Sequence, residues 1–414
     1  MTQTVEKSSK PEYKKATTLF QYLIKIKPLG LLYGSAGRFL SPENLVGRSG
    51  NSFPPSAATL SGIFAAEYWK QKNDRNEDSE ESKKPDPFES LQLAGAFWAY
   101  DDDIKSNSQD FYVPTPMNCL VKDSQITSLL TWNSDREEWQ SALPRKQQDK
   151  ESDTDYARDK YKPKNDKYQK GSWLKLSDWG ELKPPKKEVH SEDYDGFPKV
   201  ITQTPWQFLP HLHPRLAEDQ RCVDEGNAQG SLFLENSVQM KPDVSLVYLS
   251  SMPLENGWYR FGGEGHLVEI ESIPLSNDLT NLLNRDVGNC FATITPAIWG
   301  SNRKSYREPV VGDRCESVWY PSHKADQIKP ILVQRPSPMR YRLGNYSPDG
   351  ETKTTQPVAQ AKRLSRGRYA VPPGAVYVVD RSLPCWQNWD EEWFPKEAYS
   401  FKRWGCGLAL PLPV

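Results

Sequence analysis

The chain has 414 residues, of which 36% are hydrophobic, and its 53 Lys and Arg nearly balance its 54 Asp and Glu. This length favours two domains, and the balanced charge excludes a globally basic nucleic-acid-binding protein, so any RNA-binding surface must be a local patch. No apolar segment reaches the length of a membrane span, and none of the six cysteines forms a Cys-x-x-Cys pair. We therefore expect a cytoplasmic protein with free thiols and no membrane association.

The first elements along the chain are a strand, a long connection and a helix. Residues 1–18 are polar and charged, which predicts a flexible tail. Residues 22–27 alternate between apolar and polar side chains, a pattern typical of a strand. After a glycine-rich connection at 28–50, Ser56 is placed to cap a helix over 57–71.

The middle of the chain is interrupted by polar segments. Residues 91–100 predict an apolar strand, the three aspartates at 101–103 begin a polar loop, and 111–114 resume a strand. Residues 134–170 contain 10 Lys and Arg and 9 Asp and Glu, with Leu143 as the one Leu, Ile, Val, Met or Phe. Such a stretch cannot bury enough apolar surface to fold alone, so we expect an insertion that is mobile or ordered only on a partner.

The second half contains more regular elements. Residues 244–249 and 267–270 predict strands, and 278–284 suit a short helix. Further strands are expected at 290–294, 375–379 and 408–414. Strands that alternate sparsely with helices indicate an α+β fold rather than a doubly wound sheet.

A glycine-rich segment lies between the two strands at 244–249 and 267–270. Gly262, Gly263 and Gly265 allow a positive φ, and their backbone amides could cradle phosphate oxygens. Arg260 and His266 flank them and add charge. A plain tight hairpin explains the same glycines equally well, and composition alone favours it.

A local excess of positive charge follows. Residues 301–370 carry 14 Lys and Arg against 6 Asp and Glu. Arginine pairs with phosphates, and aromatic rings stack on unpaired bases. A solvated basic face is the common alternative, but this patch and the glycine segment together favour RNA. The basic residues that cluster with Tyr341 or Tyr369 are Arg340, Arg342, Lys362, Arg363, Arg366 and Arg368.

The common motifs of enzymes are absent from the sequence. It contains no Walker A loop, no G-x-G-x-x-G, no H-E-x-x-H and no G-x-S-x-G. The aspartates at 101–103 would point to opposite faces of an extended chain, which disfavours a Mg²⁺ site. We therefore expect no cofactor, no metal and no catalytic residue.

Five short segments, in chain order, resemble segments of one known family. They are 26–29 with 37–39 (IKPL and GRF), 53–62 (FPPSAATLSG), 261–266 (FGGEGH), 294–297 (ITPA) and 371–377 (VPPGAVY). The family is the third subunit of the Cmr complex, the type III-B CRISPR effector, which belongs to the RAMP superfamily. The chain departs from it at His266, where the family usually has Arg, and at residues 33–35, which replace an acidic–basic pair.

The resemblance implies a fold of two ferredoxin-like (RRM-like) domains with long inserted loops. The first would span 19–272 and include the polar insertion at 134–170. The second would span 273–414. The strand, connection and helix at the start of the chain suit the first half of such a domain.

The resemblance also implies a function in antiviral defence without catalysis. The subunit would grip the 5′ tag of the CRISPR RNA, dock on the large polymerase-like subunit, contact the backbone subunits and meet target RNA only indirectly. The residues expected to bind RNA are Arg38, Arg48, Arg260, Gly262, Gly263, Gly265, His266, Arg340, Arg363, Arg366 and Arg368.

Two alternatives remain open at this stage. The RAMP superfamily includes metal-independent endoribonucleases that process CRISPR RNA, and such an enzyme would use a histidine as its general base. His211, His213 and His266 are the candidates. The other alternative is an architectural bridge whose neighbours hold the RNA.

Overall fold

The structure is a computed structural model of the whole chain. It describes residues 19–33, 53–73, 90–105, 109–144, 169–186, 189–191, 193–214, 232–263, 265–300, 304–312, 316–323, 327–341, 365–397 and 399–413. The expected tail at 1–18 lies outside these ranges, as does most of the connection at 28–50.

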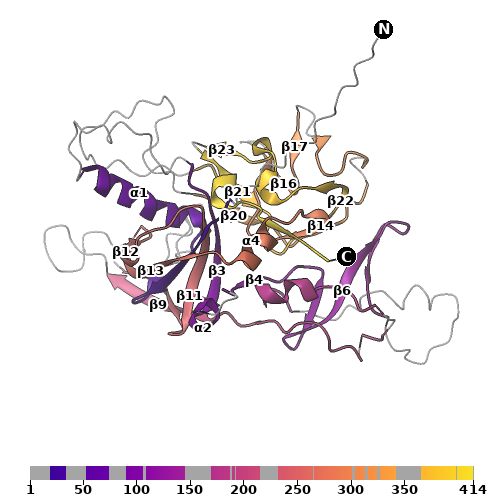
Figure 1. The fold of residues 1–414 in the computed structure, drawn as a ribbon, viewed down its shortest axis with the longest axis horizontal. Helices are drawn as coiled ribbons and strands as arrows, with labels where there is room; N and C mark the ends of the chain where they lie inside the picture. The colour runs from indigo at the N-terminus through magenta and orange to yellow at the C-terminus, as the bar shows by residue number, and fades with distance from the viewer. Residues whose placement is uncertain are drawn as a thin grey trace, which may run out of the picture.

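A seven-stranded antiparallel sheet forms the centre of the first two thirds of the chain (Figure 1). Its strands, in spatial order, are β12 (Gly257–Phe261), β13 (His266–Pro274), β1 (Tyr22–Pro28), β11 (Val244–Ser250), β3 (Leu93–Tyr100), β4 (Tyr112–Pro114) and β8 (Trp173–Lys175). Strand β11 is buried at every position, as expected for an apolar run covered on both faces. One helix, α1 (Ala57–Asn73), connects β1 to β3 and contacts β3 and β12.

Two smaller antiparallel sheets come from the segments between β4 and β11, with β2 from the start of the chain added to one of them. One contains β5 (Cys119–Lys122), β6 (Gln125–Asn133) and β7 (Glu138–Ser141). The other contains β2 (Leu32–Tyr33), β10 (Leu232–Met240) and β9 (Trp206–Pro214). Strand β7 lies inside the insertion expected at 134–170, so the expectation of a segment that is mobile or ordered only on a partner is wrong for 134–144. The pairing of β7 with β6 and the burial of Leu143 order this part, whereas 145–168 lie outside the described residues.

The last third of the chain forms a four-stranded antiparallel sheet and several short ladders. The sheet has the order β19 (Ile331–Leu332), β22 (Val376–Leu383), β14 (Gly288–Thr293) and β25 (Ala409–Pro411). The short strands are β15 (Trp299–Gly300), β16 (Ser305–Tyr306), β17 (Val310–Val311), β18 (Glu316–Ser317), β20 (Ser337–Met339), β21 (Arg368–Ala370), β23 (Lys396–Glu397) and β24 (Tyr399–Ser400). The helix α4 (Asn277–Leu283) precedes β14, and the Ser276 hydroxyl caps it by accepting a hydrogen bond from Leu279 N at 3.3 Å.

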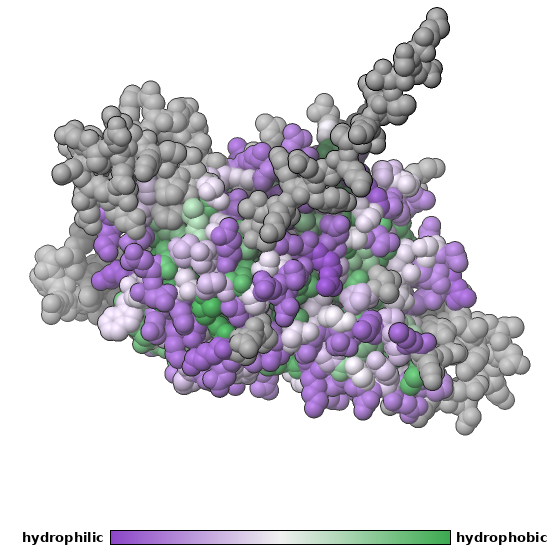
Figure 2. Space-filling view, viewed as in Figure 1, coloured by the Kyte–Doolittle hydropathy of each residue, from purple (hydrophilic) through white to green (hydrophobic). Residues whose placement is uncertain are grey.

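One hydrophobic core joins the large sheet to the C-terminal sheet. The C-terminal part contributes the 3₁₀ helices η5 (Trp386–Asn388), η6 (Glu391–Trp393) and η7 (Phe401–Trp404), and η4 (Leu176–Glu181) follows β8. Gly405 packs directly against Ala94 of β3, and Trp179 Nε1 donates a hydrogen bond to Pro411 O at 2.7 Å. Figure 2 shows mostly hydrophilic residues on one face, with hydrophobic residues in small groups between them. The buried apolar side chains of this core therefore hold the two sheets together.

The expected elements correspond closely to these strands and helices, and the α+β class is confirmed. The strands expected at 22–27, 91–100, 111–114, 244–249, 267–270, 290–294, 375–379 and 408–414 are β1, β3, β4, β11, β13, β14, β22 and β25, and the expected helices are α1 and α4. No helix among the described residues is long and apolar enough to cross a membrane. The described cysteines, Cys119, Cys290, Cys385 and Cys406, are free thiols, as expected.

The three aspartates at 101–103 are not a polar loop. They begin the short helix α2 (Asp101–Lys105), where acidic side chains suit the positive end of the helix. Asp101 lies 2.7 Å from Lys27 Nζ and 3.3 Å from Lys25 Nζ, and Ser245 Oγ donates a hydrogen bond to it at 2.7 Å. Burial alone would raise the pKa of Asp101, but these hydrogen bonds and charges outweigh it and lower the pKa to about 2.

We expect Asp101→Asn to destabilise the fold by about 2 kcal/mol at neutral pH, because Lys25 and Lys27 lose the carboxylate that both contact. The folded-state pKa of about 2 lies below the ordinary value of 3.8, so the stability is present above that value and is lost as the pH falls toward 2. Urea denaturation at several pH values measures this. Asp102, the exposed neighbour of Asp101, provides the control variant Asp102→Asn. An equal loss of unfolding free energy in both variants would contradict the stabilising role of the Asp101 carboxylate.

Candidate RNA-binding site

The glycine-rich segment forms the turn of the β12–β13 hairpin. Phe261 and His266 are its closing pair, and Gly265 N donates a hydrogen bond to Gly262 O at 3.3 Å. Gly262 and Gly265 have φ values of +78° and +66°. A Cβ at Gly262 would have nothing within 4 Å, so the backbone conformation, not a lack of space, requires glycine there. The turn is a tight hairpin whose tip, Gly262 and Gly263, is exposed.

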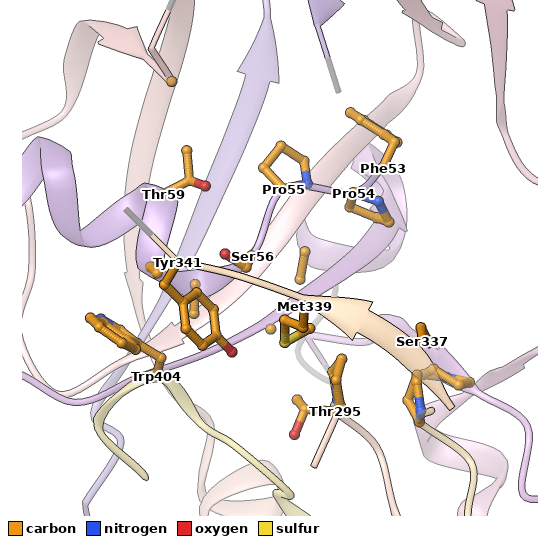
Figure 3. A pocket seen from close by; sticks show the side chains of 18 of the residues that line it. Phe53, Pro54, Pro55, Ser56, Thr59, Thr295, Ser337, Met339, Tyr341 and Trp404 are labelled. Carbon is orange, nitrogen blue, oxygen red and sulfur yellow. The ribbon is translucent and has the colours of Figure 1, made fainter. Parts of the chain in front are cut away.

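A cavity of about 960 Å³ opens beside this turn. Its walls come from segments far apart in the sequence: 53–59 at the start of α1, the glycine turn, 294–296, 337–341 and 372–373. Figure 3 shows β20 crossing the site, with the side chains of Met339 and Tyr341 lying between the proline-rich start of α1 and Thr295. Four of the five segments that suggested a family in the sequence thus meet at one place.

The lining combines positive charge with apolar surface. The described lining residues include Arg260, His266 and Arg340, and no Asp, Glu or Lys. Tyr341 is a further ionisable residue in this lining. Burial raises the pKa of Tyr341, which keeps its phenol neutral. Prolines, alanines, Met339 and Trp404 supply the apolar part. Cations suit phosphates and an apolar floor suits bases, so the cavity fits unpaired nucleotides.

Buried hydrogen bonds fix the proline-rich wall of the cavity. The buried Tyr248 of β11 donates a hydrogen bond from its hydroxyl to Pro55 O at 2.7 Å. Thr59 N then donates to Ser56 O at 2.8 Å as α1 begins. The first turn of α1 is thereby held against the cavity, where its backbone N–H groups and dipole favour an anion.

The opposite wall is fixed through Thr295. Its hydroxyl donates to Gly405 O at 2.5 Å and accepts a hydrogen bond from Leu408 N at 2.8 Å. These bonds tie the segment at 294–297 to the chain that follows Trp404. The indole of Trp404 packs 4.8 Å, between ring centroids, from the buried ring of Tyr341. The C-terminal segment is therefore part of the site.

Comparison with known proteins decides the family. A family model described as "CRISPR-associated protein (Cas_Cmr3)" matches residues 24–413. The chain belongs to this family. The resemblance to the third subunit of the Cmr complex is therefore confirmed, over nearly the whole chain.

Solved structures similar to this Cas_Cmr3 chain come from CRISPR effector complexes. One is a chain of a type III-B Cmr-beta complex bound to cognate target RNA, at 14% identity and a TM-score of 0.40, covering 86% of this chain and 85% of that chain. Another belongs to a Csm3–Csm4 subcomplex of the type III-A interference complex, at 12% identity and a TM-score of 0.36, covering 95% and 100%. No curated protein matches the chain.

The cavity brings together several of the residues predicted to bind RNA in this Cas_Cmr3 protein. Arg260, Gly262, Gly263, His266 and Arg340 line it. Gly265 lies directly beneath the Arg260 side chain, since a Cβ there would be 3.7 Å from Arg260 Cδ and Nη1. The other predicted residues that lie outside the described part of the chain are Arg38, Arg48 and Arg363.

The two remaining predicted arginines lie near Glu397. Arg366 is exposed, and its backbone N donates to Glu397 Oε2 at 3.0 Å. Arg368 is buried, forms an ion pair with Glu397, and lies 5.0 Å from the centroid of the Phe401 ring. The Arg368 guanidinium thus supports the fold, and RNA binding by either arginine stays a prediction.

Of the candidate histidines His211, His213 and His266, the described cavity lining includes only His266. His211 lies half-buried on β9, opposite Glu235, and the side chain of His213 lies outside the described part. The described residues contain no group of three His, Cys, Asp or Glu that could hold a metal ion.

Several lining residues were not predicted to contact RNA. Thr295, Pro372 and Pro373 lie in segments that the family resemblance had picked out, so that signal could have found them. Met339 and Trp404 carry no sequence signal of this kind. They reach the cavity through the β20–β21 ladder and through the packing of η7 on β3.

Proposed function

We propose that this protein is a non-catalytic RNA-binding subunit of a type III CRISPR effector complex, and that it holds the 5′ tag of the CRISPR RNA across the cavity. The observation that carries the proposal is the meeting of four family-like segments around a cavity whose described lining includes Arg260 and Arg340 and no Asp or Glu. The Arg260 and Arg340 guanidinium groups contact phosphates, and the glycine turn and the first turn of α1 present backbone amides. The apolar floor receives unstacked bases.

The strand order supports a ferredoxin-like first domain. In the series β13-β1-β11-β3, the fourth strand lies next to the first, followed by the third and the second, and α1 connects the first to the second. This is the order of the βαββαβ ferredoxin-like fold, with the hairpin strand β12 and the glycine turn standing where a second helix would be. We propose the same fold class for 273–414, a domain boundary near 272, and a cytoplasmic location.

The proposal includes protein partners. Docking on the large polymerase-like subunit and on the backbone subunits would place the cavity, and therefore the tag, at a fixed position in the assembly. Target RNA would meet this subunit only indirectly.

Single substitutions in the cavity test the proposal. We expect Arg260→Ala and Arg340→Ala each to weaken binding of tagged CRISPR RNA roughly tenfold and to lower the salt dependence by about one phosphate contact. Fluorescence anisotropy over a salt series measures both quantities. Arg136→Ala, at an exposed turn outside the cavity, is the matched control. Equal binding of RNA with and without the tag would refute tag recognition.

The nuclease alternative is examined in the same preparation. His266 lines the cavity beside Arg260, which places an imidazole where RNA would lie. Incubation with repeat RNA in EDTA should leave the RNA intact, because the proposed role is binding. Site-specific cleavage that disappears in His266→Ala would overturn the non-catalytic assignment.

A further inference from the structure

Trp258 is far more exposed than a tryptophan ordinarily is. Its relative exposure is 70%, the highest among the exposed large hydrophobic residues of the described chain. It lies on β12, the terminal strand of the seven-stranded sheet, so β12 has a described strand partner on one side only. An exposed tryptophan on a sheet edge marks a surface that another molecule covers.

The indole belongs to an apolar patch that spans three strands. Trp258 and Arg260 lie on one face of β12, and Leu267 of β13 is directly opposite Arg260. Leu267 is 47% exposed, and Leu29, at the end of β1, is 46% exposed. Leu29 N donates a hydrogen bond to Leu267 O at 3.1 Å, which holds the two leucines side by side. We call Trp258, Leu267 and Leu29 the edge patch.

The rim of the edge patch carries both signs of charge. Glu269 is opposite Trp258 on one side and Lys27 on the other, and Lys27 is itself paired with Asp101 at 2.7 Å. Arg260 adds one further cation. A rim of mixed sign suits a protein surface, whereas a nucleic-acid surface would be uniformly basic.

We infer that the edge patch binds a neighbouring protein subunit, which adds an extended segment to the side of β12 that has no described strand partner and lays an apolar side chain against Trp258. Strand addition satisfies the backbone of a terminal strand and uses pockets between alternate side chains for specificity. An exposed tryptophan with an arginine two residues away on the same strand face resembles the anchors of protein interfaces, which are enriched in Trp and Arg. The inference rests on the proposed membership of an effector complex, and it separates protein docking on β12 from RNA binding in the cavity.

Binding of the purified full chain to each of the other effector subunits, without RNA, tests this surface. Trp258→Ala should weaken binding to one subunit by at least about tenfold, as expected for an interface anchor, and leave the affinity for tagged RNA unchanged. Hydrogen exchange of the amides at 257–261 should slow when that subunit binds. Leu267→Ser provides a second variant, and a thermal unfolding scan shows that each variant is folded.

The controls make the outcomes distinct. Ile328→Ala removes another large side chain, 62% exposed, outside the patch and should change nothing. Arg340 lines the cavity, so Arg340→Ala should weaken only RNA binding. If Arg340→Ala has no effect on RNA binding, the RNA proposal fails, and this result is independent of the test of the edge patch. Unchanged subunit binding in Trp258→Ala overturns the inference. Weakened RNA binding with intact subunit binding overturns it as well, in favour of a base-stacking platform. Unchanged exchange at 257–261 overturns strand addition.

Discussion

Gly405→Ala should be among the most damaging single substitutions in this protein, at a cost of about 3–5 kcal/mol. Gly405 has a φ of +69°, and a Cβ there would lie 2.4 Å from Ala94 Cβ and 2.6 Å from Ala94 Cα. Both neighbouring atoms belong to β3, an inner strand of the large sheet, so neither can move without disturbing the core. The free energy of unfolding from urea denaturation measures the loss.

Gly288→Ala is the matched control. Gly288 has the same φ of +69°, but a Cβ there would meet nothing within 4 Å. It should therefore show only the backbone cost of a positive φ, about 1 kcal/mol. Equal losses in the two variants would mean that η7 can shift away from β3, and the clash would not explain the effect.

Reversing the charge at both cavity arginines should produce the largest loss of RNA affinity. In the double variant Arg260→Glu and Arg340→Glu, the two cations proposed to bind phosphates become anions in a cavity whose described lining has no other Asp or Glu. We expect the affinity for tagged CRISPR RNA to fall by roughly 10²–10³-fold at physiological salt, because attraction becomes repulsion at two positions. The difference from the wild type should shrink as salt is added.

A double charge reversal outside the cavity distinguishes the effect of cavity charge from the effect of the net charge of the protein. Arg136→Glu and Arg285→Glu change the net charge of the protein by the same amount at two exposed positions outside the cavity. This control should bind tagged RNA nearly as well as the wild type. A comparable loss in both double variants would show that net charge, not the cavity, governs binding.

The sequence predicted the regular elements well because their signals are local. The alternation in β1, the apolar run of β11 and the Ser276 cap of α4 each lie within a few consecutive residues. Strands β9 and β10 carry weaker patterns, and their pairing with each other and with β2 depends on residues that are far apart in the sequence. Such pairing leaves little trace in composition.

The candidate site was predictable in part for the same reason. The glycine turn is a local motif, and its neighbours Arg260 and His266 were found with it. Arg368 looked like part of an exposed basic cluster because its partner, Glu397, lies on a different ladder. Tyr341 was read as a ring available for stacking, yet it is buried against Phe401 and Trp404. The burial of a side chain by a distant segment is set by tertiary packing, which composition does not reveal.

The place of Trp404 and Thr295 in the cavity wall has a consequence for how the protein matures. The chain emerges from the ribosome from its N-terminus, and the β1–α1–β3 unit is complete long before η7 is made. The wall closes only when Gly405 has reached β3 and Leu408 has bonded to Thr295. A nascent chain that has not yet delivered residues 404–408 therefore has no finished cavity, and under the proposed function it could not yet hold RNA.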